Sequence, residues 1–328
     1  MSNFVNIFWF NTKRIAAKRN YLIICLILNI LSISLAVYFT AKMEIKANIA
    51  VISSQNINIQ SDYVKITKLA EKPKKSELVM NKYDAVVIDR GNREYDIETI
   101  KGESFKNNLM NSLKNPMQNS WSIYGEKRGV GTNILGYLIM VILMEGFMFM
   151  VCFTEDKESG TFKRILISPS DEAAYFLAQC FFNFLIIYVP AFLIMIIAHW
   201  TLGMDIGFSL VKYSYMLAIL AFAATCFGLF MCSIIEKEDN AMALSASIIV
   251  ITSLLSGSFY SFNNSSSIIK FIISIIPQKQ YMYMIQGIEN GHPFINYMPQ
   301  FFYVMILAVA FIVAAAKICK RRFNLGRY

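Results

Sequence analysis

Charged residues are scarce in this 328-residue sequence, and their scarcity excludes an ordinary soluble protein. Asp, Glu, Lys and Arg make up 16% of the chain, whereas hydrophobic residues make up 56%. Soluble domains are typically about 25% charged and 45–50% apolar. The apolar residues also form runs of roughly 18–20 residues with almost no charge, which is the length that a bilayer core requires. The sequence therefore predicts an α-helical polytopic membrane protein.

Motifs for catalysis and metal binding are also missing. The sequence has no GxxxxGK[ST] phosphate-binding loop, and its two histidines, His199 and His292, have no HExxH-type partner. Its six cysteines lie in or beside apolar runs without CxxC spacing. That placement is typical of buried free thiols rather than of a disulfide framework or a zinc site. We expect no catalytic residue, no metal site and no cofactor bound by this chain.

The net charge of +9 indicates membrane topology rather than a nucleic-acid partner. Outside the long polar loop that starts at residue 42, most Lys and Arg residues flank the apolar runs at one predicted side of the membrane. Basic residues flank the first and the last run, and cytoplasmic segments carry this bias. We expect both termini in the cytoplasm, and therefore an even number of spans.

Six membrane-spanning helices satisfy this rule. The fifth is the weakest, because Ser and Asn dilute its end. An amphipathic interfacial helix is predicted at residues 1–19, before the first span, and a basic cytoplasmic tail at 318–328. The predicted spans are residues 20–41, 132–153, 175–201, 212–235, 241–260 and 299–317.

Three connections carry further predictions. Residues 42–131 contain three short β-branched runs and a polar run of helical character from Ile97 to Leu113, so we expect a small extracellular α/β domain there. Residues 261–298 contain an apolar run too short to span, followed by Pro277, which indicates re-entrant or interfacial helices. Residues 154–174 form a charged cytoplasmic loop, in which FKRILI predicts a short amphipathic coupling helix that ends before Pro169.

This charged loop resembles that of a known family. Its sequence EDKESGTFKRILISPS resembles the E-x-x-x-G-T-x-x-R-[LI]-L-x-x-P-[LVS]-[ST] loop of ABC transporter permeases of type 2. The order of one span, a large outer lobe and five further spans resembles a subgroup of that family over essentially the whole chain. The matching positions are Glu155 or Glu158, Gly160, Thr161, Arg164, Leu166, Pro169 and Ser170.

The resemblance implies a type-2 ABC exporter permease fold and a non-catalytic subunit of a bacterial plasma-membrane exporter. Two permeases would pair, as a homodimer or heterodimer, above two separate ATPase subunits that hold ATP and Mg. The N-terminal helix and the charged loop would contact the ATPases, and closure would drive a hydrophobic or amphiphilic compound outward, such as an antimicrobial peptide, toxin or drug. The implied coupling residues are Glu155, Lys157, Glu158, Gly160, Thr161, Lys163, Arg164, Leu166, Pro169 and Ser170.

Two alternatives remain open from the sequence. The permease could export sodium or another ion, although few charged residues within the spans favour a lipophilic cargo. The chain could instead be a non-transporting receptor or anchor whose outer lobe binds a ligand. Membrane lipids surround the protein in each case.

Glu145 is an ionisable residue within the second predicted span. A charged side chain in a span costs about 2.5–3.5 kcal/mol on insertion scales, so it usually faces a bundle interior or a water path. Glu145 is therefore either a transport-pathway residue or an interhelical contact, protonated or hydrogen-bonded, that holds the packing.

Overall fold

The computed structural model divides the chain into two compact units. One holds residues 1–37 and 128–328, and the other holds residues 38–127. The structure describes residues 2–42, 47–52, 64–69, 73, 83–89, 95–99, 103–114, 129–167, 172–203, 206–235, 237–259 and 267–325.

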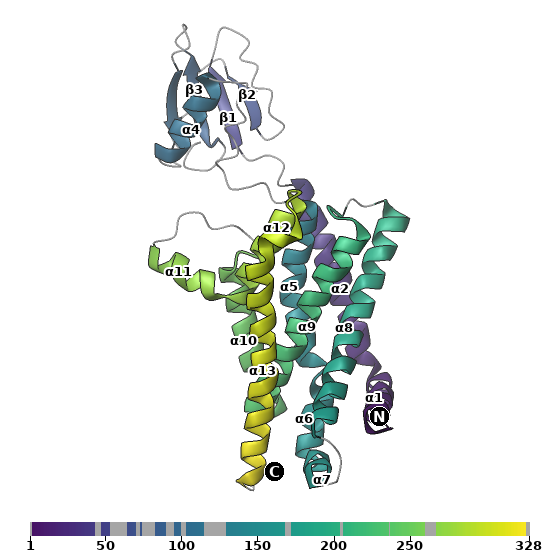
Figure 1. The fold of residues 1–328 in the computed structure, drawn as a ribbon. Helices are drawn as coiled ribbons and strands as arrows, with labels where there is room; N and C mark the ends of the chain where they lie inside the picture. Colours follow the sequence, from purple (N-terminus) through teal and green to yellow (C-terminus); the bar gives the residue numbers. More distant parts are fainter. Residues whose placement is uncertain are drawn as a thin grey trace. The chain divides into compact units, whose positions relative to one another are not determined.

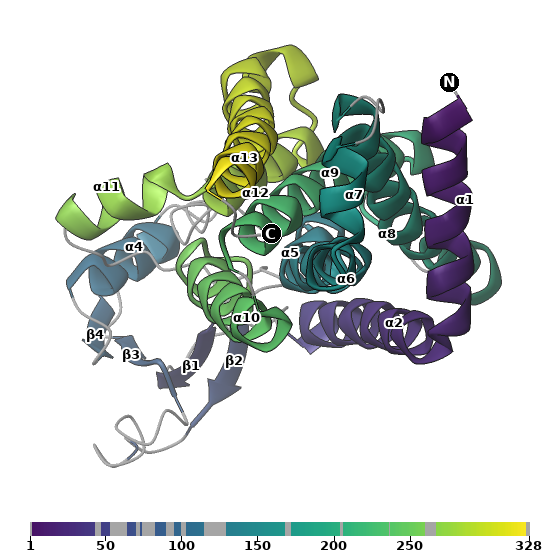
Figure 2. The same cartoon turned by 90° about the horizontal axis from the view of Figure 1, so that it is seen from below.

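The first unit is a bundle of helices. Seen along the bundle, α5 and α9 lie at its centre, with α2, α8, α10 and α13 around them (Figure 2). Its elements are α1 (Ser2–Ala17), α2 (Arg19–Lys42), α5 (Val130–Met148), α6 (Val151–Glu158), α7 (Thr161–Ile167), α8 (Glu172–Leu202), α9 (Leu210–Ile234), α10 (Glu238–Leu255), α11 (Ser267–Ile275), α12 (Pro277–Glu289), the 3₁₀ helix η2 (Phe294–Tyr297) and α13 (Met298–Asn324).

The prediction of an α-helical polytopic membrane protein is confirmed. Within the described residues, α10 is the shorter apolar helix at the predicted fifth span. It ends before Gly257, whose φ of 79° breaks the helical path. Its 18 residues extend about 27 Å, close to the thickness of a bilayer core. In the part of the chain that the structure describes, five stretches are long and apolar enough to cross a membrane: Arg19–Thr40, Val130–Glu158, Ala173–Thr201, Leu210–Ile234 and Phe294–Asn324.

Glycines allow α5 and α9 to cross closely at the centre of the bundle. A Cβ atom added to Gly146 would lie 2.4 Å from the carbonyl oxygen of Ala224, and one added to Gly228 would lie 2.2 Å from that of Gly146. Small residues are enriched at such crossings in membranes, since they let helix backbones approach. Asn183 of α8 donates a hydrogen bond to the Gly146 carbonyl over 2.8 Å, which joins a third helix to this crossing.

Two helix boundaries differ from the predicted ones. The second predicted span, 132–153, is broken by a turn at Phe149 and Met150 that separates α5 from α6. The basic tail predicted at 318–328 is helical as far as Asn324, because α13 continues beyond the apolar run. The predicted short apolar helix before Pro277 agrees with α11, which spans residues 267–275, and α12 starts at Pro277, where the missing N–H of proline is tolerated in the first helical turn.

The second unit is a small α/β fold. Its strands are β1 (Ala47–Ile52), β2 (Val64–Lys68), β3 (Ala85–Asp89) and β4 (Tyr95–Thr99), in the order β2-β1-β3-β4. β1 runs parallel to β2 and β3, and β4 runs antiparallel to β3. The helix α4 (Glu103–Lys114) contributes Leu109 to a core with side chains of the sheet.

The helical character predicted from Ile97 onward is wrong for its first residues. They belong to β4, in which Ile97 is buried and pairs with Val87 of β3. Polar residues alternate with Ile97 along this strand, so only one face of β4 is apolar. The α/β fold predicted for this unit therefore gains a fourth strand, β4, beyond the three β-branched runs that the sequence shows.

Candidate functional site

The two ends of the chain, α6 and α7 lie at one end of the helical bundle (Figure 1). We call residues 151–167, which form α6 and α7, the α6–α7 segment. α6 continues the direction of α5 beyond the turn, and α7 follows a tight turn at Gly160. Gly160 has a φ of 68°, a conformation that favours glycine. The glycine of the predicted coupling motif is thus needed for the turn between the two helices.

Ion pairs hold the α6–α7 segment to α1. Arg14 Nη2 lies 2.6 Å from Glu155 Oε2, and Arg14 Nη1 lies 2.8 Å from Asp156 Oδ1. Arg14 Nη2 also donates to the carbonyl of Cys152 over 3.1 Å, and Lys18 pairs with the second oxygen of Glu155. A guanidinium that binds two carboxylates in this way fixes both position and orientation. The N-terminal helix and the charged segment are therefore one structural unit.

Burial and charge act in opposite directions on the cations of α1. Burial lowers the pKa of Arg14 and of Lys18, because it disfavours the charged form. The attraction of Asp156 and Glu155 for Arg14, and of Glu155 for Lys18, outweighs burial and raises both pKa values. Both side chains thus keep their charge against the acidic pair.

An aromatic cluster packs α7 against α8. Phe162 is fully buried, and its ring centroid lies 5.5 Å from that of Phe153 and 5.4 Å from that of Tyr175. The Tyr175 hydroxyl donates to Asp156 Oδ2 over 2.7 Å. Asp156 therefore links the ion pairs of α1 to the aromatic cluster. The predicted amphipathic helix places its phenylalanine inside and its basic residues outside.

Lys157 ties α6 to the carboxyl end of α9. Its side chain is buried, and Nζ donates to the carbonyl oxygens of Cys232 and, over 3.1 Å, Ile235. Arg322 of α13 donates to the carbonyls of Ser233, over 3.1 Å, and Ile234. Cations are favourable at this end of a helix, where carbonyls lack intrahelical partners and the helix dipole is negative. Lys157, implied as a surface contact, thus lies inside the bundle.

The remaining predicted coupling residues divide into three groups. Glu158, Lys163 and Arg164 are exposed, and in the described part of the chain they take part in no ion pair. Gly160, Thr161 and Leu166 are half-buried, and Thr161 shares a hydrogen bond of 2.9 Å with Ser159. Pro169 and Ser170 lie outside the described residues. The segment thus presents a charged surface from a base that the rest of the chain holds.

A family model described as ABC-2 type transporter matches residues 105–290, more than half of the chain. The chain belongs to the ABC-2 type transporter family. No curated protein matched the sequence. ABC-2 permeases are transmembrane subunits, generally non-catalytic, that in general work with an ABC ATPase. The chain is thus a multi-pass membrane protein and an ABC-2 permease, as the loop motif and the span order predict.

Sequence reasoning missed three side chains that position the α6–α7 segment of this ABC-2 permease. Arg14, Asp156 and Tyr175 come from α1, α6 and α8, and Arg14 precedes the matched region. One available signal was charge: a basic helix and an acidic Glu–Asp pair were both predicted on the same side of the membrane. No local pattern pointed to Tyr175.

Glu145 of this ABC-2 permease is buried against α2. Asn29 Nδ2 donates to Glu145 Oε1 over 2.6 Å. Among the described residues, Asn29 Oδ1 and Glu145 Oε2 have no hydrogen-bond partner. A protonated carboxyl could use its O–H to bond Asn29 Oδ1, because an acid and an amide form two such bonds side by side. This geometry favours an interhelical contact between α2 and α5.

We therefore expect Glu145→Gln to keep both stability and transport. The new amide retains an oxygen for Asn29 Nδ2 and supplies an N–H for Asn29 Oδ1. Glu145→Leu removes one of the two acceptors of the buried Asn29 Nδ2 group, and the N–H left without an acceptor costs about 1–3 kcal/mol. Thermal unfolding in detergent, together with a vesicle transport assay, measures both. A stable Glu145→Gln protein that no longer transports would assign Glu145 to the transport pathway instead.

Proposed function

We propose that this ABC-2 permease exports a hydrophobic or amphiphilic compound, of the class of antimicrobial peptides, toxins or drugs, with ATP hydrolysed by separate subunits. The observation that carries the proposal is the α6–α7 segment. Its base is tied to α1 and α9 by charged groups and to α8 by an aromatic contact, while Glu158, Lys163 and Arg164 stay exposed. A soluble partner can displace such a segment, and the segment transmits that displacement to the spans.

The contacts of the segment determine which helices this displacement reaches. Arg14 connects it to α1, Phe162 to α8, and Lys157 to the carboxyl end of α9. α6 also follows α5 directly, and α5 crosses α9 at the close-packed glycines. Because packed interfaces transmit displacement rather than absorb it, movement of the segment would shift several spans together.

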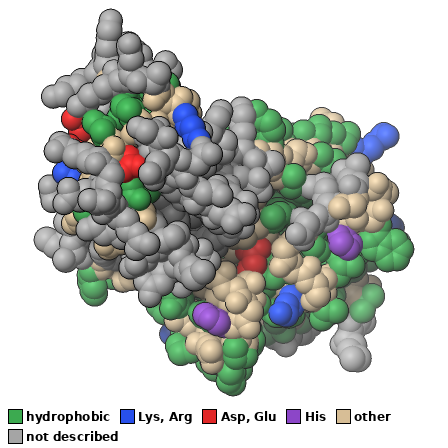
Figure 3. Space-filling model, turned by 90° about the horizontal axis from the view of Figure 1, so that it is seen from above, with side chains coloured by type: hydrophobic (Ala, Val, Ile, Leu, Met, Phe, Trp, Pro, Cys, Tyr) green, Lys and Arg blue, Asp and Glu red, His purple; other side chains and the backbone are tan. Residues whose placement is uncertain are grey.

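Charge supports a cytoplasmic position for this end of the bundle. α1, the α6–α7 segment and the end of α13 all carry basic residues there, as cytoplasmic segments do. Seen from above, the described residues carry scattered charged side chains of both signs (Figure 3). Both termini would then lie in the cytoplasm of a bacterium, with the α/β unit outside its plasma membrane.

The assembly proposed here has two ATPase subunits and a second permease, identical or homologous to this one. ATP and Mg would bind the ATPases, since the sequence has no phosphate-binding loop of its own. α2 offers a surface for such a neighbour, since it exposes a row of apolar side chains that includes Ile23, Ile27 and Ile30. Such a surface faces either lipid or a second permease.

Transport in vesicles tests the proposal. The permease is coexpressed with a candidate ABC ATPase from the same genome, and inverted vesicles are given ATP and a fluorescent lipophilic peptide. We expect uptake that needs ATP and stops when the ATPase loses its phosphate-loop lysine. Uptake of radioactive sodium in place of the peptide would favour ion efflux. Absence of any ATP-dependent uptake, with no ATPase copurified, would favour a receptor or anchor.

A further inference from the structure

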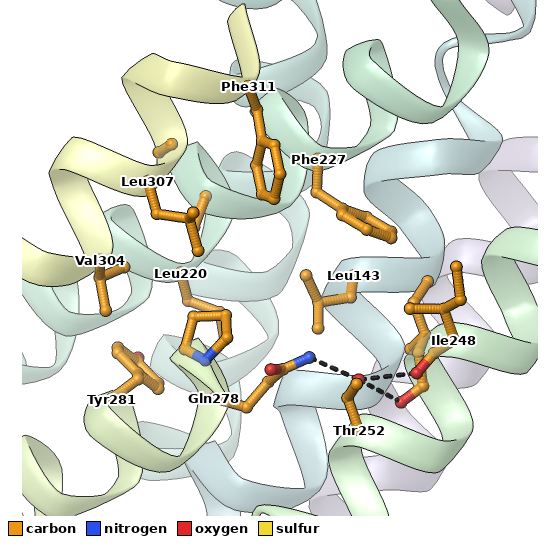
Figure 4. Close-up of a pocket in the computed structure, with 14 residues that line it drawn as sticks. Leu143, Leu220, Phe227, Ile248, Thr252, Gln278, Tyr281, Val304, Leu307 and Phe311 are labelled. Carbon is orange, nitrogen blue, oxygen red and sulfur yellow. Dashed lines mark hydrogen bonds between the residues drawn. The ribbon is translucent and has the colours of Figure 1, made fainter. Parts of the chain in front are cut away.

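An apolar cavity of about 190 Å³ lies within the bundle, between α5, α9, α10, α12 and α13. Side chains that point into it come from all five helices and include Leu143, Leu220, Ile248, Tyr281 and Phe311 (Figure 4). Its walls belong to a single subunit, so it exists before any assembly forms. Almost all of its lining is hydrocarbon, which suits an apolar occupant.

One polar edge interrupts this lining. Thr252 Oγ1 donates to the carbonyl of Ile248 over 2.7 Å and lies 3.3 Å from that of Ile249 (Figure 4). Its hydroxyl has one hydrogen, so it must accept the 2.8 Å bond from Gln278 Nε2. This fixes the orientation of the Gln278 amide. Among the described residues, Gln278 Oε1 is buried and has no hydrogen-bond partner.

The wall that carries Gln278 is held in place by contacts at several points. At the far end of α12, Glu289 accepts hydrogen bonds from the N–H groups of Gly131, over 2.7 Å, and Thr132, over 2.8 Å. These bonds satisfy free donors at the amino end of α5. In the middle of α12, the Tyr281 hydroxyl donates to the carbonyl of Met216 over 2.8 Å. The cavity is therefore preformed, and the free Gln278 oxygen has a fixed position.

The surroundings indicate where an occupant comes from. α10, which forms one wall, exposes Ile251 and Leu254 on its outer side, and α11, which leads into α12, exposes Phe271 and Ile272. In a membrane-spanning chain such side chains face lipid or a neighbouring permease. A molecule dissolved in the bilayer therefore meets the elements that enclose the cavity.

We propose that this cavity binds a hydrocarbon chain that ends in a hydroxyl group, taken from the bilayer, and that the hydroxyl donates to Gln278 Oε1. An apolar wall selects the chain, and an unsatisfied buried acceptor selects a donor over an ether or an alkane. The site does not depend on the direction or the cargo of transport, so it stands apart from the proposed exporter function.

Photolabelling of the purified full chain in phosphatidylcholine nanodiscs tests the site. The two probes are a hexadecanol with a diazirine in its chain and the methyl ether of the same compound. We expect the alcohol to label peptides of α10 and α12 about fivefold more than the ether does, the factor that roughly one hydrogen bond gives. Gln278→Leu should remove this preference. Equal labelling by both probes in the unchanged protein would overturn the proposal.

Two further variants keep the test specific. Gln280→Leu is the matched control, because Gln280 lies on the same helix outside the cavity lining and donates to the Ser274 carbonyl over 2.6 Å. It should keep the fivefold preference. Ala308→Phe places a ring in the cavity and should remove labelling by both probes, with an unchanged size-exclusion profile. Undiminished labelling in Ala308→Phe would place the probes elsewhere and contradict the site.

Discussion

The Arg14→Glu variant is expected to lose transport and to melt well below the unchanged protein. The substitution removes the cation that binds Glu155 and Asp156 and puts a third negative charge beside them. Asp156 is buried, and breaking a buried ion pair costs about 3–5 kcal/mol, because one charge is left without its partner. At about 2–4 °C per kcal/mol, the apparent melting temperature in detergent should fall by about 6 °C or more.

Two companion variants separate this effect from a general loss of charge. Lys13→Glu makes the same change one residue earlier on the exposed side of α1, and should leave melting and transport nearly unchanged. Arg14→Glu combined with Glu155→Lys restores opposite charges across the contact and should recover part of both. If Lys13→Glu were as damaging as Arg14→Glu, the contact with the α6–α7 segment would not be the cause.

The second large effect is expected for Lys157→Met. Methionine keeps the length and apolar stem of the side chain but removes the ammonium that donates to the Cys232 and Ile235 carbonyls. Hydrogen bonds from charged donors contribute about 1.5–3 kcal/mol each, and the favourable charge at the α9 dipole is lost with them. We expect a loss of about 3 kcal/mol in stability, measured by thermal unfolding, and weaker coupling of ATP hydrolysis to transport.

Lys163→Met is the matched control for this prediction. It removes the same charged group from an exposed position on α7, six residues away, where no ion pair is lost within the described chain. Its stability should stay within about 0.5 kcal/mol of the unchanged protein. Similar melting curves for Lys157→Met and the unchanged protein would contradict a structural role for the buried ammonium.

Hydropathy and local sequence pattern are sufficient to predict the membrane spans and the short helices. Long uncharged runs predicted the membrane helices, and FKRILI predicted α7 because a short amphipathic helix buries its phenylalanine and exposes its basic side. Those features depend on neighbours in the sequence. The end of α13 was harder to predict, because basic residues after an apolar run are equally compatible with a helix or a free tail.

The contacts that define the site could not be predicted from hydropathy or local pattern. Arg14 and Glu155 are 141 residues apart, and no periodicity connects them. Lys157 lies in a charged stretch that is typical of a solvated loop, yet it turns inward because the end of α9 offers it carbonyl oxygens. The last three residues of β4 fall in a polar run that favours a helix, since a five-residue strand with one buried position is too short to be distinguished by pattern.

The coupling role of the α6–α7 segment is tested by a double variant, Glu158→Lys with Arg164→Glu. The measurement is the ratio of molecules transported to ATP hydrolysed in vesicles that carry this variant. Both residues are exposed on the α6–α7 segment, and the pair of changes preserves net charge while reversing it at each position. If the segment passes force from the ATPase to the spans, the protein should fold and reach the membrane while the ratio falls at least about tenfold. An unchanged ratio would contradict the role of this segment in coupling.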